Sequence, residues 1–99
     1  ASVRKMDKLL KRTSWKVGPH DYKVAWCDVI DGKDTLGYCD DDAKVIYIKN
    51  GQTVADAFST LIHELLHAME HENKIKISHQ GLYKFERAIF NFLTHNKVI

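Results

Sequence analysis

Two histidines and a glutamate stand together in one short run, His63-Glu64-Leu65-Leu66-His67. If this run is helical, residues four apart lie one above the other on the same face, so both imidazoles can bind one metal ion. Glu64 lies beside them, where a carboxylate can accept a proton from a metal-bound water. The pattern H-E-x-x-H is typical of zinc-dependent hydrolases, which makes zinc the expected cofactor and Glu64 the expected catalytic base.

The residues around this motif are expected to form a helix. Thr53, followed three residues later by Asp56, resembles a capping box at its start, and Asn73 is a candidate for its end. On a helical wheel the two histidines lie opposite the centre of the apolar face, so a solvated polar face that carries two histidines is the alternative interpretation. The apolar positions recur at helical spacing and are Val54, Ala57, Phe58, Leu61, Ile62, Leu65, Ala68 and Met69.

A second helix is predicted from about Ser78 to Thr94, with Ser78 as its N-cap. His79, Tyr83 and Glu86 follow one another at spacings of four and three, so they share one face of this helix. They fall inside the apolar stripe, where a carboxylate is costly unless something pairs with it, and a metal ion is such a partner. The predicted stripe consists of Leu82, Phe85, Ile89, Phe90, Phe92 and Leu93.

Zinc hydrolases hold the metal with three side chains and leave one position to water, so a third ligand must come from elsewhere in the chain. His71 continues the four-residue ladder but lies eight residues from His63, about 12 Å along a helix, which argues against it as a ligand of the same ion. Glu86 is favoured as the third ligand because its carboxylate is expected to be buried. His79, on the same face, is the alternative ligand.

The part of the chain that precedes the motif has the pattern of short strands. Residues 22–27 alternate in character, and residues 45–48 form a strongly apolar, β-branched run. Turn signals occur at residues 18–19, 31–34 and 40–42. Consecutive short turns predict an antiparallel meander, so the expected fold is α+β, with a small antiparallel sheet of three to four strands packed on two main helices.

Composition and charge narrow the classes of function. Residues 1–99 are expected to form a single small domain, and the net charge of +2 is too small to indicate a nucleic-acid partner. No run approaches membrane-spanning length, so no membrane partner is expected, and nothing indicates an oligomeric state. Cys27 and Cys39 form no C-x-x-C pattern, and two free thiols without a signal-like apolar stretch favour the cytoplasm. The basic residues 1–13 predict either a short helix or a mobile arm.

The motif and the glutamate that follows it resemble the gluzincin group of zinc peptidases. More closely, the stretch from Val45 to Leu93 is similar to small metallopeptidase-like proteins encoded by phages and prophages. In those proteins a strand with an Ile-x-Ile pattern leads into Thr-Leu-x-His-Glu-x-x-His-Ala, and a following helix carries a Leu-Glu or similar pair. Here the strand is at residues 46–48, the helix reads so at residues 60–68, and Phe85-Glu86 stands where the later pair lies.

A competing resemblance is to the SprT-like group, in which a third histidine follows the motif by about a dozen residues in a His-Gly-x-x-Phe context. The stretch His79-Gln80-Gly81-Leu82-Tyr83 matches that context only in part, because an extra residue precedes the glycine. This resemblance implies that His79, in place of Glu86, is the third metal ligand.

These resemblances imply a zinc metallopeptidase whose substrate is a peptide or protein, in the host cytoplasm if the chain is phage-encoded. Zinc lowers the pKa of its bound water to about 7, and Glu64 is expected to accept the proton of that water. Tyr83 and His79 are the candidates for a hydrogen-bond donor to the tetrahedral intermediate. The zincin resemblance implies that the strand at residues 45–48, or its neighbour, binds the substrate backbone by strand addition.

Two other classes of function are open at this point. The first is a non-catalytic zinc-containing binding or accessory module, and the small size of the chain favours it. The second is an inhibitor or nucleic-acid-binding accessory protein that acts through the basic N-terminus.

Overall fold

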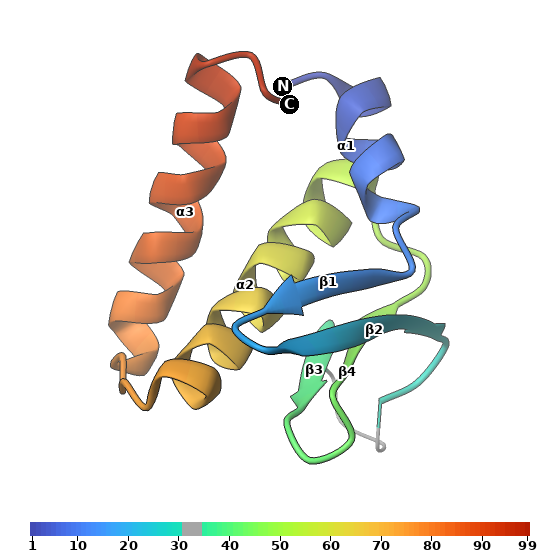
Figure 1. Ribbon diagram of the computed structural model, residues 1–99. Helices are drawn as coiled ribbons and strands as arrows, with labels where there is room; N and C mark the ends of the chain where they lie inside the picture. Colours follow the sequence, from blue (N-terminus) through green and yellow to red (C-terminus); the bar gives the residue numbers. More distant parts are fainter. Residues whose placement is uncertain (31–34) are drawn as a thin grey trace.

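The computed structural model describes residues 1–30 and 35–99, which form helices and a sheet in one α+β arrangement (Figure 1). The turn predicted at residues 31–34 lies outside the described residues. The elements, in chain order, are α1 Val3–Leu10, β1 Ser14–Val17, β2 His20–Cys27, β3 Gly37–Asp40, β4 Val45–Lys49, α2 Val54–Asn73 and α3 His79–His95. The α+β fold class predicted from the sequence is confirmed.

The sheet has the strand order β1-β2-β4-β3 and is mixed. β1 pairs with β2 and β3 pairs with β4 in antiparallel fashion, but the central pair, β2 and β4, is parallel. The predicted all-antiparallel meander is therefore wrong. Strand β3 does not pair with β2, the strand before it in the chain; it forms the outer edge, and the β3–β4 hairpin then places β4 between β3 and β2. Antiparallel neighbours can be joined by a tight turn, whereas a parallel pair needs a longer connection, which strand β3 and its flanking segments provide between β2 and β4.

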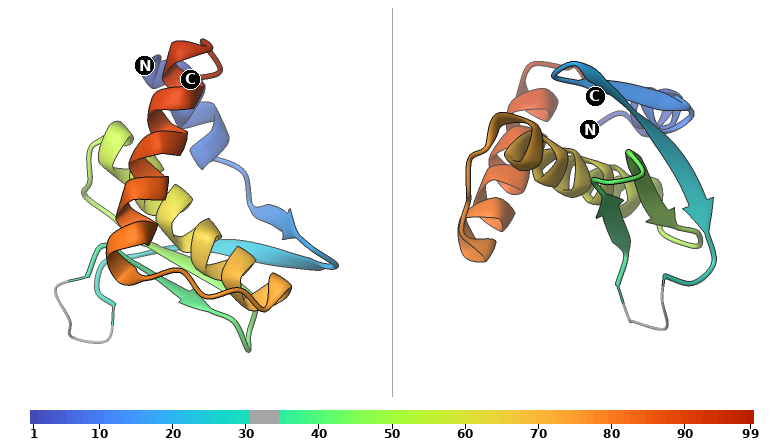
Figure 2. Two further views of the ribbon diagram at one scale, coloured as in Figure 1. Left: turned by 90° about the vertical axis from the view of Figure 1, so that its left-hand side faces the viewer. Right: turned by 60° about the horizontal axis from the view of Figure 1, so that its bottom comes forward.

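Helix α2 lies across one face of this sheet, and the core forms between them (Figures 1 and 2). Strand β4 contributes Ile46 and Ile48 to the core, and neither residue is accessible to solvent, as expected for alternate positions of a strand. Phe58 and Leu61 of α2 are buried against them. The long helix that carries the motif is therefore anchored along the sheet by its apolar face.

Residues 1–13 include the short helix α1, so the first of the two predicted alternatives holds. Ser2 caps α1, because its hydroxyl accepts a hydrogen bond from the backbone N–H of Lys5. Met6 and Leu10 are buried, and α1 packs against α2. Arg4, Lys5 and Lys8 thus belong to a folded helix, and Lys11 and Arg12 follow its end.

The ends of the two long helices agree with the capping signals in the sequence. The Thr53 hydroxyl accepts a hydrogen bond from the backbone N–H of Asp56, and α2 ends at Asn73, after which Lys74 takes a left-handed conformation. Ser78 caps α3 by accepting from the N–H of Gly81. Both predicted helix starts are confirmed.

The predicted apolar stripe of α3 is too wide. Leu82 is buried at the contact with α2, but Phe85 and Phe92 are 54% and 64% exposed. Helix α3 stands beside α2 and packs against no other helix or strand of the described residues, so only a narrow face of it can be buried (Figure 1). Met69, predicted on the apolar face of α2, is also exposed.

None of the helices in the described residues is both long enough and apolar enough to cross a membrane.

Candidate metal centre

A cavity of about 670 Å³ opens between strand β3, helix α2 and the first half of α3. Strand β3 forms one wall, with Gly37 and Tyr38 among its residues, and the other two walls come from the helices. The structure brings all of the predicted site residues together on these walls: His63, Glu64, His67, His79, Tyr83 and Glu86.

His63 is held at the α2–α3 contact by a side-chain hydrogen bond with Glu86. Its Nδ1 lies 2.8 Å from Glu86 Oε1, and the two side chains are only 13% and 19% exposed. Burial lowers the pKa of the His63 imidazole, and the neighbouring His67 and His79 lower it further, against the opposing effect of Glu86. A neutral imidazole whose Nδ1 donates to a carboxylate keeps a lone pair on Nε2.

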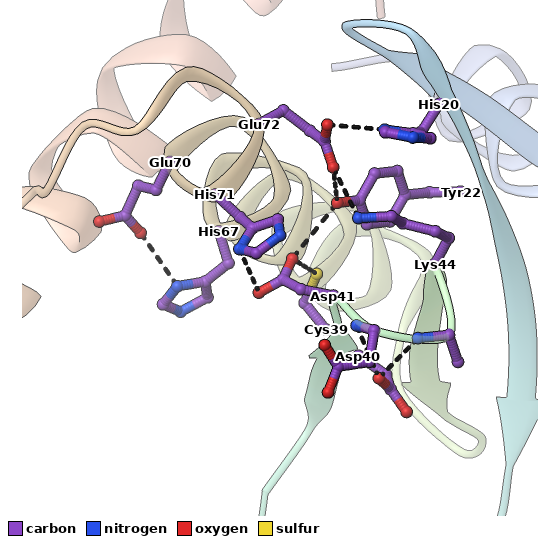
Figure 3. A network of polar contacts seen from close by, with 12 residues as sticks. His20, Tyr22, Cys39, Asp40, Asp41, Lys44, His67, Glu70, His71 and Glu72 are labelled. Carbon is purple, nitrogen blue, oxygen red and sulfur yellow. Dashed lines mark hydrogen bonds and ion pairs between the residues drawn. The ribbon is translucent and has the colours of Figure 1, made fainter.

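His67 lies next to His63, with 4.9 Å between the ring centroids, as expected one helical turn apart. Its Nδ1 also contacts a carboxylate, at 3.0 Å from Glu70 Oε1 (Figure 3). The other oxygen of Glu70 accepts a hydrogen bond from the backbone N–H of Ile77 at 2.7 Å. Glu70 was not among the residues predicted from the sequence, although its spacing of three from His67 places the two on neighbouring positions of the helix surface.

Glu64 follows His63 on the same helix, lines the same cavity and is only 6% exposed. It lies against strand β3 at Gly37, where an added Cβ would be 2.9 Å from Glu64 Oε2 and 2.5 Å from Thr60 Cγ2. Burial, and secondarily the charge of Glu86, raise the pKa of the Glu64 carboxyl to about 7. Gly37 is thus a site residue that sequence analysis missed, since only the close approach of a strand to a helix makes a side chain at that position unacceptable.

Helix α3 supplies two rings beside the histidine pair. The centroid of the Tyr83 ring lies 5.0 Å from that of His63 and 5.1 Å from that of His79, while the rings of His63 and His79 are 6.4 Å apart. Tyr83 is 54% exposed at the mouth of the cavity. His79 and Tyr83 are therefore placed on the face predicted from their spacing.

His71 does not line the cavity. Its Nδ1 lies 3.8 Å from Asp41 Oδ2, in the turn that follows β3, and its side chain is 49% exposed. The rise along α2 separates it from His63 as the sequence argument required.

A second group of polar contacts fastens the last turn of α2 to the sheet (Figure 3). The carboxylate of Glu72 accepts from the Tyr22 hydroxyl at 2.6 Å and from Lys44 Nζ at 2.9 Å, and its other oxygen lies 2.8 Å from His20 Nδ1. These hydrogen bonds lower the pKa of the Glu72 carboxyl to about 2. Burial, and then the contact with Glu72, raise the pKa of Tyr22. The end of the motif helix is therefore fixed to the sheet by contacts that involve neither motif histidine.

Cys27 and Cys39 are free thiols, as expected, and both are half-buried. Cys39 lines the cavity and lies 3.4 Å from Asp41 Oδ1. Burial and the nearby Asp41 raise the pKa of its thiol.

The cavity side chains fit two of the three ligands that a catalytic zinc ion needs. Each motif histidine is held through Nδ1 by a carboxylate, and neither Nε2 has a hydrogen-bond partner among the described residues. Carboxylates that hold the non-ligating nitrogen of a histidine are common in zinc sites. In residues 1–30 and 35–99, however, no three His, Cys, Asp or Glu side chains converge as a ready-made ligand set. The third ligand is therefore not fixed by the side-chain positions.

Comparison of the chain with protein-family models, with curated proteins and with solved structures finds no match. The resemblance to gluzincins and to small phage metallopeptidase-like proteins remains a prediction from the motif residues. The geometry of the cavity is the basis for the function proposed next.

Proposed function

We propose that this chain is a zinc-dependent metallopeptidase in which His63 and His67 hold the ion and Glu64 is the catalytic base. The observation that carries the proposal is the pairing of both imidazoles with carboxylates through Nδ1, at Glu86 and Glu70, beside an open cavity. That pairing leaves both Nε2 atoms available, which is the state in which histidine binds zinc.

Glu86 is the proposed third ligand, since its carboxylate already lies at the histidine pair and carboxylate oxygen is a normal ligand of zinc. To bind the ion, Glu86 must exchange its hydrogen bond with His63 for the metal. His79 is the alternative ligand, and the same hydrogen bond favours it, because Glu86 can then continue to hold His63. Replacing His79 with alanine decides between them: zinc affinity falls steeply only if His79 is a ligand.

A bound zinc ion would supply a Lewis acid that lowers the pKa of a coordinated water to about 7. Glu64, which lines the cavity, is the proposed acceptor of the proton of the water that attacks the peptide carbonyl, and it would pass that proton to the leaving amine. Tyr83 is the proposed hydrogen-bond donor to the carbonyl oxygen as negative charge develops there. Its ring beside His63 and its exposure at the cavity mouth support this role.

Strand β3 is the proposed docking edge for the substrate backbone. Strand β4, which covers residues 45–48, lies between β2 and β3 and has no free edge for a further strand. Its neighbour β3 is therefore the strand proposed to bind the substrate backbone. β3 is an edge strand and also lines the cavity through Gly37 and Tyr38. An extended peptide that adds to this edge would run past the histidine pair.

A non-catalytic zinc-containing binding or accessory module is the second candidate. The same Nδ1 pairing supports it, because two imidazoles with available Nε2 atoms can bind zinc whether or not the ion is catalytic. Such a module would bind peptide or zinc in the cavity without turnover.

The experiment that tests the proposal measures zinc content and peptide hydrolysis together. Wild-type protein is expected to bind one zinc ion per chain and to cleave an internally quenched peptide library, with activity lost on chelation and restored by zinc. The variant Glu64→Gln should retain zinc and lose hydrolysis. Zinc binding without hydrolysis in the wild type supports the module instead, and hydrolysis by Glu64→Gln at the wild-type rate contradicts the role of Glu64.

A further inference from the structure

We propose that Glu70 is the positioning residue of the metal centre: it sets the tautomer and orientation of His67 and ties that orientation to the start of helix α3. This inference rests on the proposed function of the same site. Glu70 does not line the cavity and has no place in the proposed proton transfers.

The two oxygens of Glu70 have different partners. Oε1 lies 3.0 Å from His67 Nδ1, and Oε2 accepts from the backbone N–H of Ile77 at 2.7 Å. The Glu70 side chain is only 15% exposed, so water competes weakly for these bonds. One carboxylate therefore links a histidine of α2 to the segment that leads into α3.

The bond to His67 has a chemical consequence for metal binding. An ionised carboxylate only accepts hydrogen bonds, so Nδ1 of a neutral His67 must carry the ring proton. The lone pair is then on Nε2, and the hydrogen bond to Glu70 restrains the orientation of the ring. Without Glu70, the neutral ring is free to place its proton on Nε2 or to rotate, and either change weakens the binding of zinc by His67.

The hydrogen bond from the Ile77 N–H also connects Glu70 to the cavity residues on helix α3. Ile77 directly precedes Ser78, the N-cap of α3, and His79 is the first residue of that helix. Fixing the N–H of Ile77 to the same carboxylate that holds His67 sets the distance between the histidine pair and the α3 residues of the cavity. Glu70 thus places the first turn of α3 relative to the metal ligands of α2.

Glu72 offers a matched control on the same helix. It too is a poorly exposed glutamate with several polar partners, namely Tyr22, Lys44 and His20, but it contacts neither motif histidine. Replacing Glu72 with glutamine therefore disturbs the attachment of α2 to the sheet without touching the tautomer of His67. A purely structural role for Glu70 would make the two variants behave alike.

The test compares Glu70→Gln with Glu72→Gln in two measurements on the full chain. The first is the ¹⁵N spectrum of the imidazoles in metal-free protein near pH 8. Wild type and Glu72→Gln should show His67 protonated at Nδ1, and Glu70→Gln should show a mixture with protonation at Nε2. The second is zinc affinity by competition with a chromophoric chelator, where Glu70→Gln should bind about 10- to 100-fold more weakly and Glu72→Gln within about 3-fold of wild type.

An unchanged His67 tautomer in Glu70→Gln, or equal losses of zinc affinity in the two variants, would overturn the inference. The spectrum of the metal-free protein does not depend on hydrolysis, so it distinguishes the failure of this inference from the failure of the proposed function. If the wild type binds zinc and does not cleave peptides, the tautomer and affinity results still decide the role of Glu70.

Discussion

Replacing Glu64 with glutamine should make the metal-free protein more stable at alkaline pH and leave its stability nearly unchanged at acidic pH. Glu64 is buried between α2 and strand β3, and burial is the main reason that the pKa of its carboxyl is raised to about 7 from an ordinary value of 4.5. The folded protein therefore keeps the proton over a pH range in which the unfolded chain has already lost it.

The direction and size of the effect follow from proton linkage. Below about pH 4.5 both states are protonated at Glu64, and the residue adds no pH dependence. Between about pH 4.5 and 7 the folded state binds more protons than the unfolded state, so the free energy of unfolding falls by about 1.4 kcal/mol per pH unit. Above about pH 7 the loss is complete and amounts to about 3 kcal/mol. Glutamine is neutral throughout and removes this loss.

Urea denaturation, followed by tryptophan fluorescence with a chelator present, measures the effect at pH 5, 6, 7 and 8. The free energy of unfolding of Glu64→Gln minus that of wild type should rise steadily across this series and then level off. Any direct packing cost of the amide is present only in the variant and does not change with pH, so it shifts the whole series by a constant and the slope is more informative than the absolute difference. A difference that is constant with pH, or that falls as the pH rises, would refute the account of Glu64 as a buried carboxyl.

Three further predictions concern residues around the site. Glu72→Gln should make the free energy of unfolding depend less on pH below about pH 4.5. The pKa of the Glu72 carboxyl is lowered to about 2, so its contribution to stability is complete above about pH 4.5 and is lost as the pH falls toward 2. Acid titration followed by far-ultraviolet circular dichroism checks this, and an unchanged acid midpoint argues against it. Gly37→Ala should destabilise the protein by about 1–3 kcal/mol in urea, since the new Cβ would lie 2.5 Å from Thr60 Cγ2, and a variant as stable as wild type would mean that β3 is not held this close to α2. Tyr83→Phe should lower kcat by about 10²-fold or more while zinc affinity stays at the wild-type value, and a kcat within twofold of wild type would exclude Tyr83 as the donor.

Local signals predicted the helices well because their ends depend on residues close in sequence. The hydroxyls of Thr53 and Ser78 cap α2 and α3 at the positions that the sequence indicated. The sheet topology could not be predicted in the same way, because the parallel pairing of β2 with β4 depends on where the chain goes after β2, and no short motif specifies that path. Likewise, the exposure of Phe85 and Phe92 follows from the single neighbour of α3, which an apolar periodicity cannot specify.

In the candidate site, too, the features that depend on residues close in sequence could be predicted and the others could not. Spacing alone placed His63 and His67 together, and the cost of burying a carboxylate selected Glu86, which contacts His63 in the structure. Whether Glu86 or His79 binds zinc remains a prediction, since spacing selects a helix face but no ligand. Glu70 was missed because an i,i+3 pair of His and Glu on a helix is common and usually has no further role.

X-ray absorption at the zinc edge of the loaded protein shows whether the imidazoles of His63 and His67 bind the ion. We expect nitrogen and oxygen donors at about 2.0–2.1 Å, with the outer-shell scattering of two imidazole rings, or of three if His79 is the third ligand. Sulfur scattering at about 2.3 Å, or a fully hydrated ion without imidazole scattering, would contradict the account.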